Sequence, residues 1–235
     1  MLLRSQMKVG ARSFSFSWST PGSDYSSQTR DLDDFIFQNP DVLNIVTAGN
    51  SCEKIATRQG TIASPLGAKD VTSVGVSLSA AELFSLTPCA AFNPLTTVSF
   101  SSADPTLDGR LKPDVVAPGM SLVSSQSEAP WSTTRTTVTC SLQGTSQATS
   151  VRTSMVVLLY EWLRDGWWRA GRKDATVGMR SITAALLKAL IIHSSDWLQR
   201  WLGQMPTSPL SCGMLEHDAT KLSFPDVYQC QECQD

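Results

Sequence analysis

The sequence predicts an α/β fold with a mainly parallel sheet, on two observations. Residues 11–48 read as a strand, a helix and a second strand, and two apolar helices are expected further on, at 148–163 and 182–192. Parallel strands need a crossover connection, which is usually a helix and right-handed. With 235 residues, of which 41% are hydrophobic and 17% charged, the chain is long enough to bury one core.

The strand–helix–strand unit is predicted because the spacing of apolar residues changes along residues 11–48. In residues 11–18, three aromatic residues alternate with serines, the two-residue period of a strand. Residues 31–39 carry apolar side chains three and four apart, acids in the first turn and Pro40 as a stop, which predicts a short helix. Residues 42–48 are rich in β-formers and end at Gly49, which predicts the second strand.

The rest of the chain predicts further elements of the same fold. Residues 71–76 predict a strand buried on both faces. Shorter apolar stretches predict strands at 98–100, 115–117 and 122–123, among loops of the kind that carry sites. Residues 148–163 run without Pro or Gly and predict a largely buried helix. Beyond Asp196 no period is sustained, so we expect a domain over 1–195 and an atypical tail over 196–235.

The charge balance excludes some partners. Nineteen basic and 21 acidic residues give a net charge of −2, and no basic run appears, so nothing indicates nucleic acid or an anionic membrane as partner. No 18-residue apolar stretch predicts a membrane span. Residues 1–8 lack the apolar region of a secretory signal, and the localisation stays open.

The six cysteines are dispersed and leave the redox compartment undecided. Cys230 and Cys233 form a C-x-x-C pair near the end of the chain. A zinc site there would have to recruit Cys212 or His217 at a spacing that no motif supports. The alternative is a pair of tail thiols.

Ser146 is the first candidate for chemistry. It lies in Gln-Gly-Thr-Ser-Gln-Ala, a small-residue turn that leads into the apolar helix. A serine there has its hydroxyl beside unpaired backbone N–H groups that favour developing negative charge, as suits a nucleophile attacking a carbonyl. The alternative is an ordinary helix N-cap.

Asn50 is the second candidate. It follows the strand at 42–48 in a glycine turn, from which a side-chain amide can donate to an oxyanion. On its own, an asparagine in a turn is also explained by hydrogen bonds to its local backbone.

Together with other blocks, these residues resemble the subtilisin-like serine proteases (subtilases, peptidase family S8), in the order the family shows. Ser17-Trp18-Ser19 is similar to the family's Ser-x-Gly strand, and Thr47-Ala48-Gly49-Asn50 to its Ala-Ala-Gly-Asn block. Residues 64–75 and 100–119 resemble the segments between, and 144–148 resemble the nucleophile block. The resemblance covers residues 10–195, the C-terminal portion of a catalytic domain.

The resemblance implies a three-layer sandwich, N-terminally incomplete, and a serine endopeptidase that forms an acyl-enzyme on Ser146. Asn50 and the Ser146 N–H would be the oxyanion donors. A peptide or protein substrate would bind as an added strand along a cleft lined by Ser17, Trp18, Ser19, Ala48 and Gly49. The family is often secreted and often calcium-stabilised, but no ligand set can be assigned here residue by residue, so no cofactor is assigned and calcium binding stays open.

Departures from the family put activity in doubt. Its Asp and His lie before the strand at 11–18, whereas this sequence has only His193 and His217, both after Ser146. We therefore expect the chain as written to be almost inert. Arg152 stands where an apolar side chain is expected, and Ser19 and Ser150 replace a glycine and a proline. A non-catalytic peptide-binding or interaction module, or an unrelated α/β protein with coincidental blocks, are the alternatives.

Overall fold

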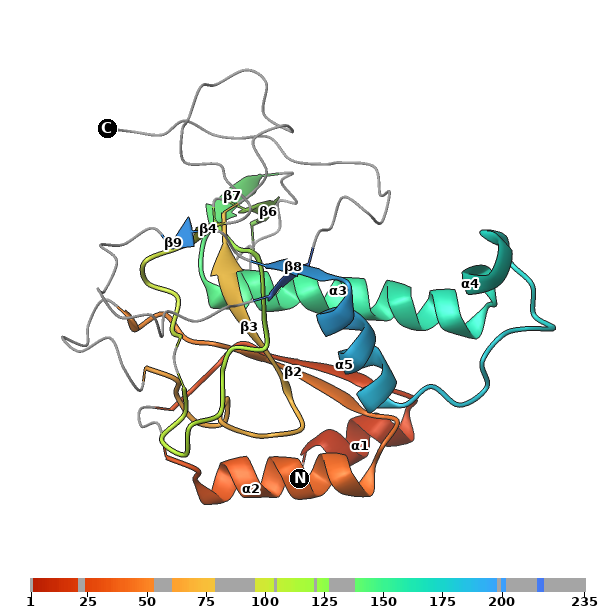
Figure 1. Cartoon of the computed structure of the whole chain (residues 1–235), viewed down its shortest axis with the longest axis horizontal. Helices are drawn as coiled ribbons and strands as arrows, with labels where there is room; N and C mark the ends of the chain where they lie inside the picture. The colour runs from red at the N-terminus through yellow and green to blue at the C-terminus, as the bar shows by residue number, and fades with distance from the viewer. Residues whose placement is uncertain are drawn as a thin grey trace, which may run out of the picture.

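A mainly parallel sheet lies at the centre of the molecule, between two layers of helices (Figure 1). The computed structural model describes residues 2–20, 24–52, 61–78, 96–103, 105–120, 122–126, 138–197, 200–201 and 215–217. The eight-stranded sheet comprises β1 (Ser13–Phe16), β2 (Leu43–Thr47), β3 (Thr72–Ser77), β4 (Thr96–Thr97), β5 (Val115–Pro118), β8 (Ser195–Trp197), β9 (Arg200–Trp201) and β10 (Leu215–His217). Its order is β1-β2-β3-β5-β10-β8, with β4 and β9 off this path. The neighbours β1, β2, β3 and β5 are all parallel, which confirms the predicted fold class.

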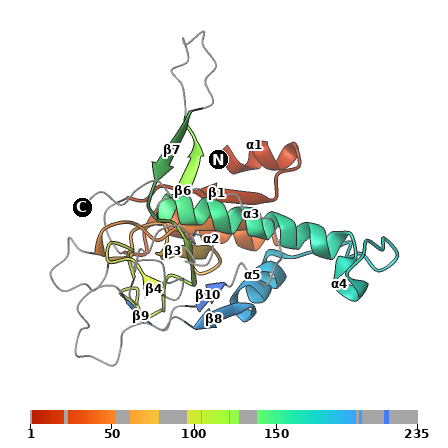
Figure 2. The same cartoon turned by 90° about the horizontal axis from the view of Figure 1, so that it is seen from above.

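Five helices and a hairpin complete the described structure. The helices are α1 (Leu2–Lys8), α2 (Ser27–Gln38), α3 (Thr145–Arg164), α4 (Trp167–Ala170) and α5 (Ala184–His193). The hairpin pairs β6 (Leu122–Ser125) with β7 (Thr139–Leu142) outside the main sheet. Viewed from above, α3 crosses the sheet and the hairpin projects beyond it (Figure 2).

The alternation of side chains along β2 builds the three layers. Leu43 and Ile45 belong to the hydrophobic cluster that contains α3 and α5 residues. Val46 belongs instead to the cluster that contains α2 residues such as Leu32 and Phe35. Because successive strand residues point to opposite faces, one buried strand joins both halves of the core.

The first turn of α2 escapes sequence prediction. The helix begins at Ser27, four residues before the predicted start, because the Ser26 hydroxyl accepts a hydrogen bond from the Thr29 N–H and caps it. The residues of this turn are mostly polar, so no apolar period marks them. α1 and β7 were likewise not predicted.

Two other predictions need correction. The strand expected at 98–100 is wrong, since β4 lies at 96–97 and pairs antiparallel with β3. α3 is less buried than expected, because packing covers one face and leaves Val157, Leu158 and Trp162 at least one-third exposed. The predicted strands at 71–76, 115–117 and 122–123 are confirmed as β3, β5 and β6.

Arg152 lies on the buried face of α3, where the family pattern has an apolar residue. Its side chain is fully buried, and its Nη2 donates a hydrogen bond of 2.8 Å to the Val116 carbonyl on β5. The charge is therefore hydrogen-bonded to the sheet, which reduces the cost of its burial.

Parts of the tail join the sheet. β10 pairs parallel with β5 and antiparallel with β8. The domain boundary expected at residue 195 stays a prediction. Cys212, Cys230 and Cys233 lie outside the described residues, and within the described ones no three metal-binding side chains gather. Among the helices that the structure describes, none has the length and apolar character to cross a membrane.

Candidate active site

The start of α3 meets the end of β1 at Ser146. The Ser146 hydroxyl donates to the Ser17 carbonyl, and the Ser17 hydroxyl donates to the Ser146 carbonyl, each at 3.4 Å. Ser17 is exposed and Ser146 is half-buried, so the nucleophile candidate faces an open surface. Two blocks 129 residues apart in sequence are thus brought together.

The amide of Asn50 is held in one orientation by Thr145. Its Oδ1 accepts hydrogen bonds from the Thr145 N–H at 3.0 Å and from the Thr145 hydroxyl at 2.8 Å. The same hydroxyl accepts the Gly49 N–H at 3.2 Å. Because Oδ1 is occupied by these donors, the Nδ2 group is the part of the amide that remains as a donor.

Gly144 brings the two loops close enough for this contact. Its φ of +144° is a conformation that side-chain-bearing residues rarely adopt. A Cβ built on it would lie 3.3 Å from Asn50 Nδ2 and 3.0 Å from Gln147 Oε1. A larger residue here would crowd the amide donor.

Two donors therefore lie at the start of α3. The N–H groups of Gln147 and Ala148 bond to the Gly144 carbonyl, whereas the Ser146 N–H has no acceptor within the described structure. The Asn50 side chain is exposed. A backbone N–H at a helix start together with a side-chain amide is a donor set suited to a carbonyl oxygen that becomes negative.

The predicted cleft residues differ in their surroundings. Trp18 is 49% exposed and packs edge-to-face on Phe16, with ring centroids 6.3 Å apart, and Ser19 is also exposed. Ala48 is buried and its N–H donates to the Val74 carbonyl. Gly49 donates to Thr145 and accepts from the Ser102 N–H. The substrate-binding roles of these residues stay predictions.

Among the side chains that the structure describes, no imidazole is hydrogen-bonded to Ser146. His193 is the last residue of α5 and is exposed, and it forms no hydrogen bond with Ser146. His217 lies in β10, whose backbone pairs with β5 and β8. The site as described is a hydroxyl with two hydrogen-bond donors nearby, Asn50 Nδ2 and the Ser146 N–H.

Sequence reasoning missed two supporting residues, Thr145 and Ser102. Ser102 bonds to the Asn50 loop twice, through its N–H to the Gly49 carbonyl at 2.8 Å and through its hydroxyl to the Ser51 N–H at 3.2 Å. Both residues lie inside blocks that resemble the family, next to residues whose role was assigned. Their function depends on contacts across the fold, which residue type and spacing do not reveal.

Comparison with known proteins points to one family. The model of the subtilase family, Peptidase_S8, matches residues 3–220. A Dictyostelium discoideum protein named "Serine protease/ABC transporter B family protein tagA" is 38% identical over 107 residues, and tagD from the same organism is 36% identical over 136 residues. These matches cover 41% and 54% of this chain but only 6% and 7% of the relatives.

Solved structures of subtilases are also similar to this chain. A structure of subtilase cytotoxin SubAB has a TM-score of 0.49 at 17% identity, covering 83% of this chain and 55% of that one. A cold-adapted subtilisin-like serine proteinase has a TM-score of 0.45 at 16% identity, covering 81% of this chain and 50% of the other.

Proposed function

Because this chain belongs to the subtilase family, we propose that it carries the nucleophile and the oxyanion donors of a serine endopeptidase. The observation that carries the proposal is the position of Ser146 at the start of α3, beside the Asn50 amide that Thr145 holds in place. The names of the relatives from Dictyostelium support the protease assignment. Since the matched regions are small parts of those relatives, the proposal extends to no other part of their names.

The proposed reaction is acyl transfer to Ser146. The hydroxyl oxygen attacks the carbonyl carbon of the scissile peptide bond while a general base takes the hydroxyl proton. The carbonyl oxygen becomes negative and accepts hydrogen bonds from Asn50 Nδ2 and the Ser146 N–H. The base then protonates the leaving amine, and water hydrolyses the acyl-enzyme. The substrate residues before the scissile bond would lie along Ser17–Ser19.

The base and its carboxylate partner would have to come from residues outside this sequence. The two histidines, His193 and His217, follow Ser146, and the family's pattern has its His and Asp before β1. β1 is an edge of the sheet in the described strand order and ends beside Ser146. A strand added at this edge would end next to the nucleophile. By themselves, the 235 residues are expected to retain at most the roughly 10³-fold to 10⁴-fold catalysis that donors and binding provide without a triad.

A second candidate is a peptide-binding module without catalysis. It is favoured by the contact of the Ser146 hydroxyl with a backbone carbonyl instead of an imidazole. The exposed Trp18 and Ser19 beside this contact would serve either role.

A fluorophosphonate probe tests the proposal, because it reacts with activated serine nucleophiles. We expect a polypeptide that joins this chain to an upstream segment with the Asp and His to be labelled. Ser146→Ala should abolish the labelling, whereas Ser150→Ala, one turn along the exposed side of α3, should preserve it.

The 235-residue chain alone should not be labelled. Labelling of this chain that Ser146→Ala abolishes would show that it contains its own base. Absence of labelling in the joined polypeptide, together with saturable quenching of tryptophan fluorescence by peptides, would favour the binding module instead.

A further inference from the structure

The segment after α3 is strongly basic. Residues 164–180 contain five basic residues and two acidic ones, a net charge of +3, although the whole chain has −2. The remaining residues therefore sum to −5. The overall charge balance, which gives no sign of an anionic partner, conceals this local excess.

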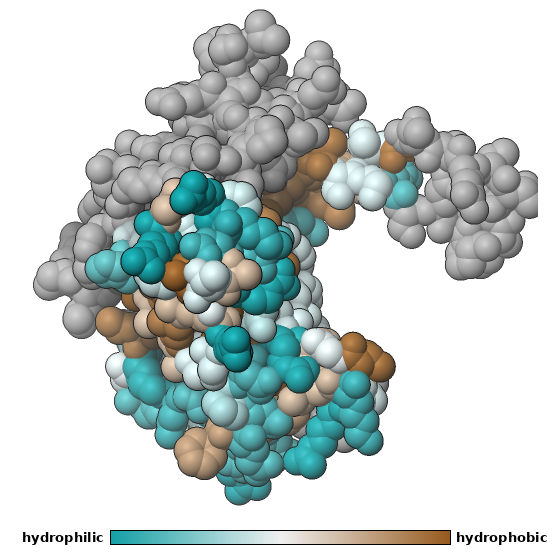
Figure 3. Space-filling view, turned by 90° about the vertical axis from the view of Figure 1, so that its right-hand side faces the viewer, coloured by the Kyte–Doolittle hydropathy of each residue, from teal (hydrophilic) through white to brown (hydrophobic). Residues whose placement is uncertain are grey.

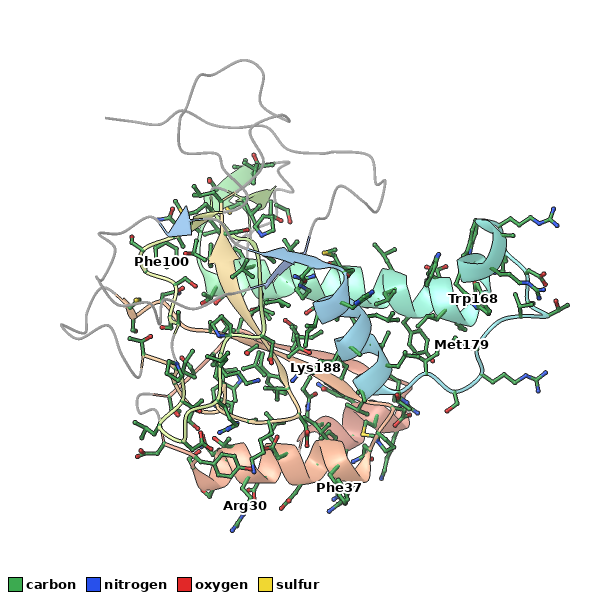
Figure 4. The ribbon with its side chains drawn as sticks, viewed as in Figure 1. Arg30, Phe37, Phe100, Trp168, Met179 and Lys188 are labelled. Carbon is green, nitrogen blue, oxygen red and sulfur yellow. The ribbon has the colours of Figure 1, made fainter. Side chains whose placement is uncertain are left out.

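Three tryptophans are exposed in the same region. Trp162 near the end of α3 is 40% exposed, and Trp167 and Trp168 on α4 are 39% and 40% exposed. The indole N–H of Trp168 donates to the Val177 carbonyl at 3.2 Å, which ties α4 to the following loop. Figure 4 shows Trp168 and Met179 close together at this end of the molecule. We call Trp162, Trp167, Trp168, Arg169, Arg172 and Arg180 the tryptophan–arginine end.

Its arginines are free to meet an external anion. Asp165 accepts hydrogen bonds from Arg164 at 2.7 Å and from Lys173 at 2.8 Å, so these two cations have a carboxylate partner. In the part of the chain that the structure describes, Arg169, Arg172 and Arg180 form no ion pair, and all three are exposed. Arg169 interacts electrostatically with Asp174, but the segment 164–180 keeps its net charge of +3. This excess of positive charge beside exposed indoles matches an anionic surface.

The position of the tryptophan–arginine end in the molecule leaves it accessible to a large partner surface. α4 and the loop after it lie at one end of the molecule's longest axis, beyond the sheet (Figures 1 and 2). The face of the molecule on this side is largely hydrophilic (Figure 3). An end that projects in this way can reach a flat surface without steric interference from the rest of the molecule.

From these observations we infer that the tryptophan–arginine end docks onto the surface of an anionic phospholipid bilayer. Tryptophan rings lie at the level of lipid headgroups, with the apolar body inward and the N–H in a polar layer. Arginines beside them bind lipid phosphates and are attracted by the negative surface potential. This contact is at the surface and requires no spanning helix.

Docking at this end would also orient the site. α3 rises about 27 Å between Ser146 and Arg164, at 1.5 Å per residue. Ser146 would therefore face away from the bilayer, toward substrates in solution. The inference does not depend on Ser146 being catalytic.

Co-sedimentation of the 235-residue chain with vesicles tests the inference. We expect stronger binding to vesicles of phosphatidylcholine mixed with phosphatidylserine than to phosphatidylcholine alone, and weaker binding as salt rises. Arg169→Gln should lower the partition coefficient about fivefold, and Arg169→Gln with Arg172→Gln about 25-fold. Trp167→Ala should also lower the partition coefficient, and it should reduce the quenching of tryptophan fluorescence by brominated lipids.

Matched controls lie on α2. Arg30 and Phe37 are exposed there, away from Trp168 (Figure 4), so Arg30→Gln and Phe37→Ala should leave binding unchanged. Equal binding to neutral and anionic vesicles, or equal losses in Arg30→Gln and Arg169→Gln, would overturn the inference. Release of the chain from the vesicles by soluble polyglutamate would also overturn the inference, since the partner would then be an acidic polypeptide.

Discussion

The two ends of strands β3 and β5 carry different polar networks. At the amino-terminal ends, Asp114 accepts hydrogen bonds from the Ser73 N–H and hydroxyl, both 2.8 Å, and from Lys112 Nζ at 2.7 Å. Lys188 Nζ from α5 lies 3.4 Å from its other oxygen. At the carboxyl ends, the Gly119 N–H donates to the Ser77 carbonyl, and the Gly119 carbonyl accepts the N–H of Gly144, just before Thr145.

The difference indicates that the amino-terminal network stabilises the strands, whereas the carboxyl-end network offers donors to a ligand. The amino-terminal network consists of charges that are largely buried and satisfied by one another, so it can fix the strands but offers little to a ligand. The carboxyl-end network is neutral and part-exposed, and it leaves the Ser146 N–H and Asn50 Nδ2 as donors. Ligands of open α/β sheets bind outside the carboxyl ends of the strands, where such donors gather.

The largest expected effect comes from neutralising the amino-terminal network. Asp114→Asn leaves Lys112 and Lys188 without their shared counter-charge, and removing one partner of a buried pair is strongly destabilising. We expect the free energy of unfolding in urea to fall by about 3 kcal/mol.

Asp41 provides the matched control. It pairs with Arg12 at 2.6 Å, but the two side chains are 51% and 39% exposed. Asp41→Asn should therefore cost less than about 1 kcal/mol. Equal losses in the two variants would contradict the structural role assigned to Asp114.

The same network also predicts that stability depends on pH. Burial lowers the pKa of Lys112 from 10.5 to about 8, although Asp114 opposes the shift. Between pH 8 and 10.5 the unfolded chain therefore holds a proton that the folded chain has released. Since stability rises with pH wherever the unfolded state binds more protons, the contribution of Lys112 to the free energy of unfolding should increase over this range.

Asp114 acts at the other end of the pH scale. Burial alone would raise the pKa of its carboxyl group, but Lys112 and Lys188 outweigh burial and lower it, so the contribution of Asp114 to stability is lost as the pH falls below 3.8. Lys112→Met should abolish the alkaline rise and retain the acid loss, because Lys188 still faces Asp114. Urea midpoints measured across the pH range check this, and a variant that keeps the full alkaline rise would assign it to another group.

The sequence was sufficient to predict the sheet because its central strands are buried on both faces. β3 is buried at all six positions, so its residues form an unbroken run of apolar and small side chains that needs no knowledge of partners. β2 is likewise buried throughout. The first turn of α2 was missed because a side-chain cap defines it, and the tail strands are short and depend on the rest of the sheet.

The site was predictable only in part, for a related reason. Ser146 and Asn50 stand in short blocks whose order could be compared with a family. The role of Thr145 depends on a contact with Gly49, 96 residues away, and that of Asp114 on a lysine in α5. Residue type suggests neither contact, because both arise when distant segments pack together.

The smallest of these effects tests the carboxyl-end network. Thr145→Val keeps the side-chain shape but removes the hydroxyl that accepts the buried Gly49 N–H and donates to Asn50. An unpaired buried N–H costs about 1–3 kcal/mol, so urea unfolding should show a loss at the lower end of this range. Thr149→Val is the control, because its hydroxyl donates to a carbonyl of its own helix. Thr145→Ser should restore stability, and a loss in Thr149→Val as large as that in Thr145→Val would show that Thr145 does not hold the donor loop.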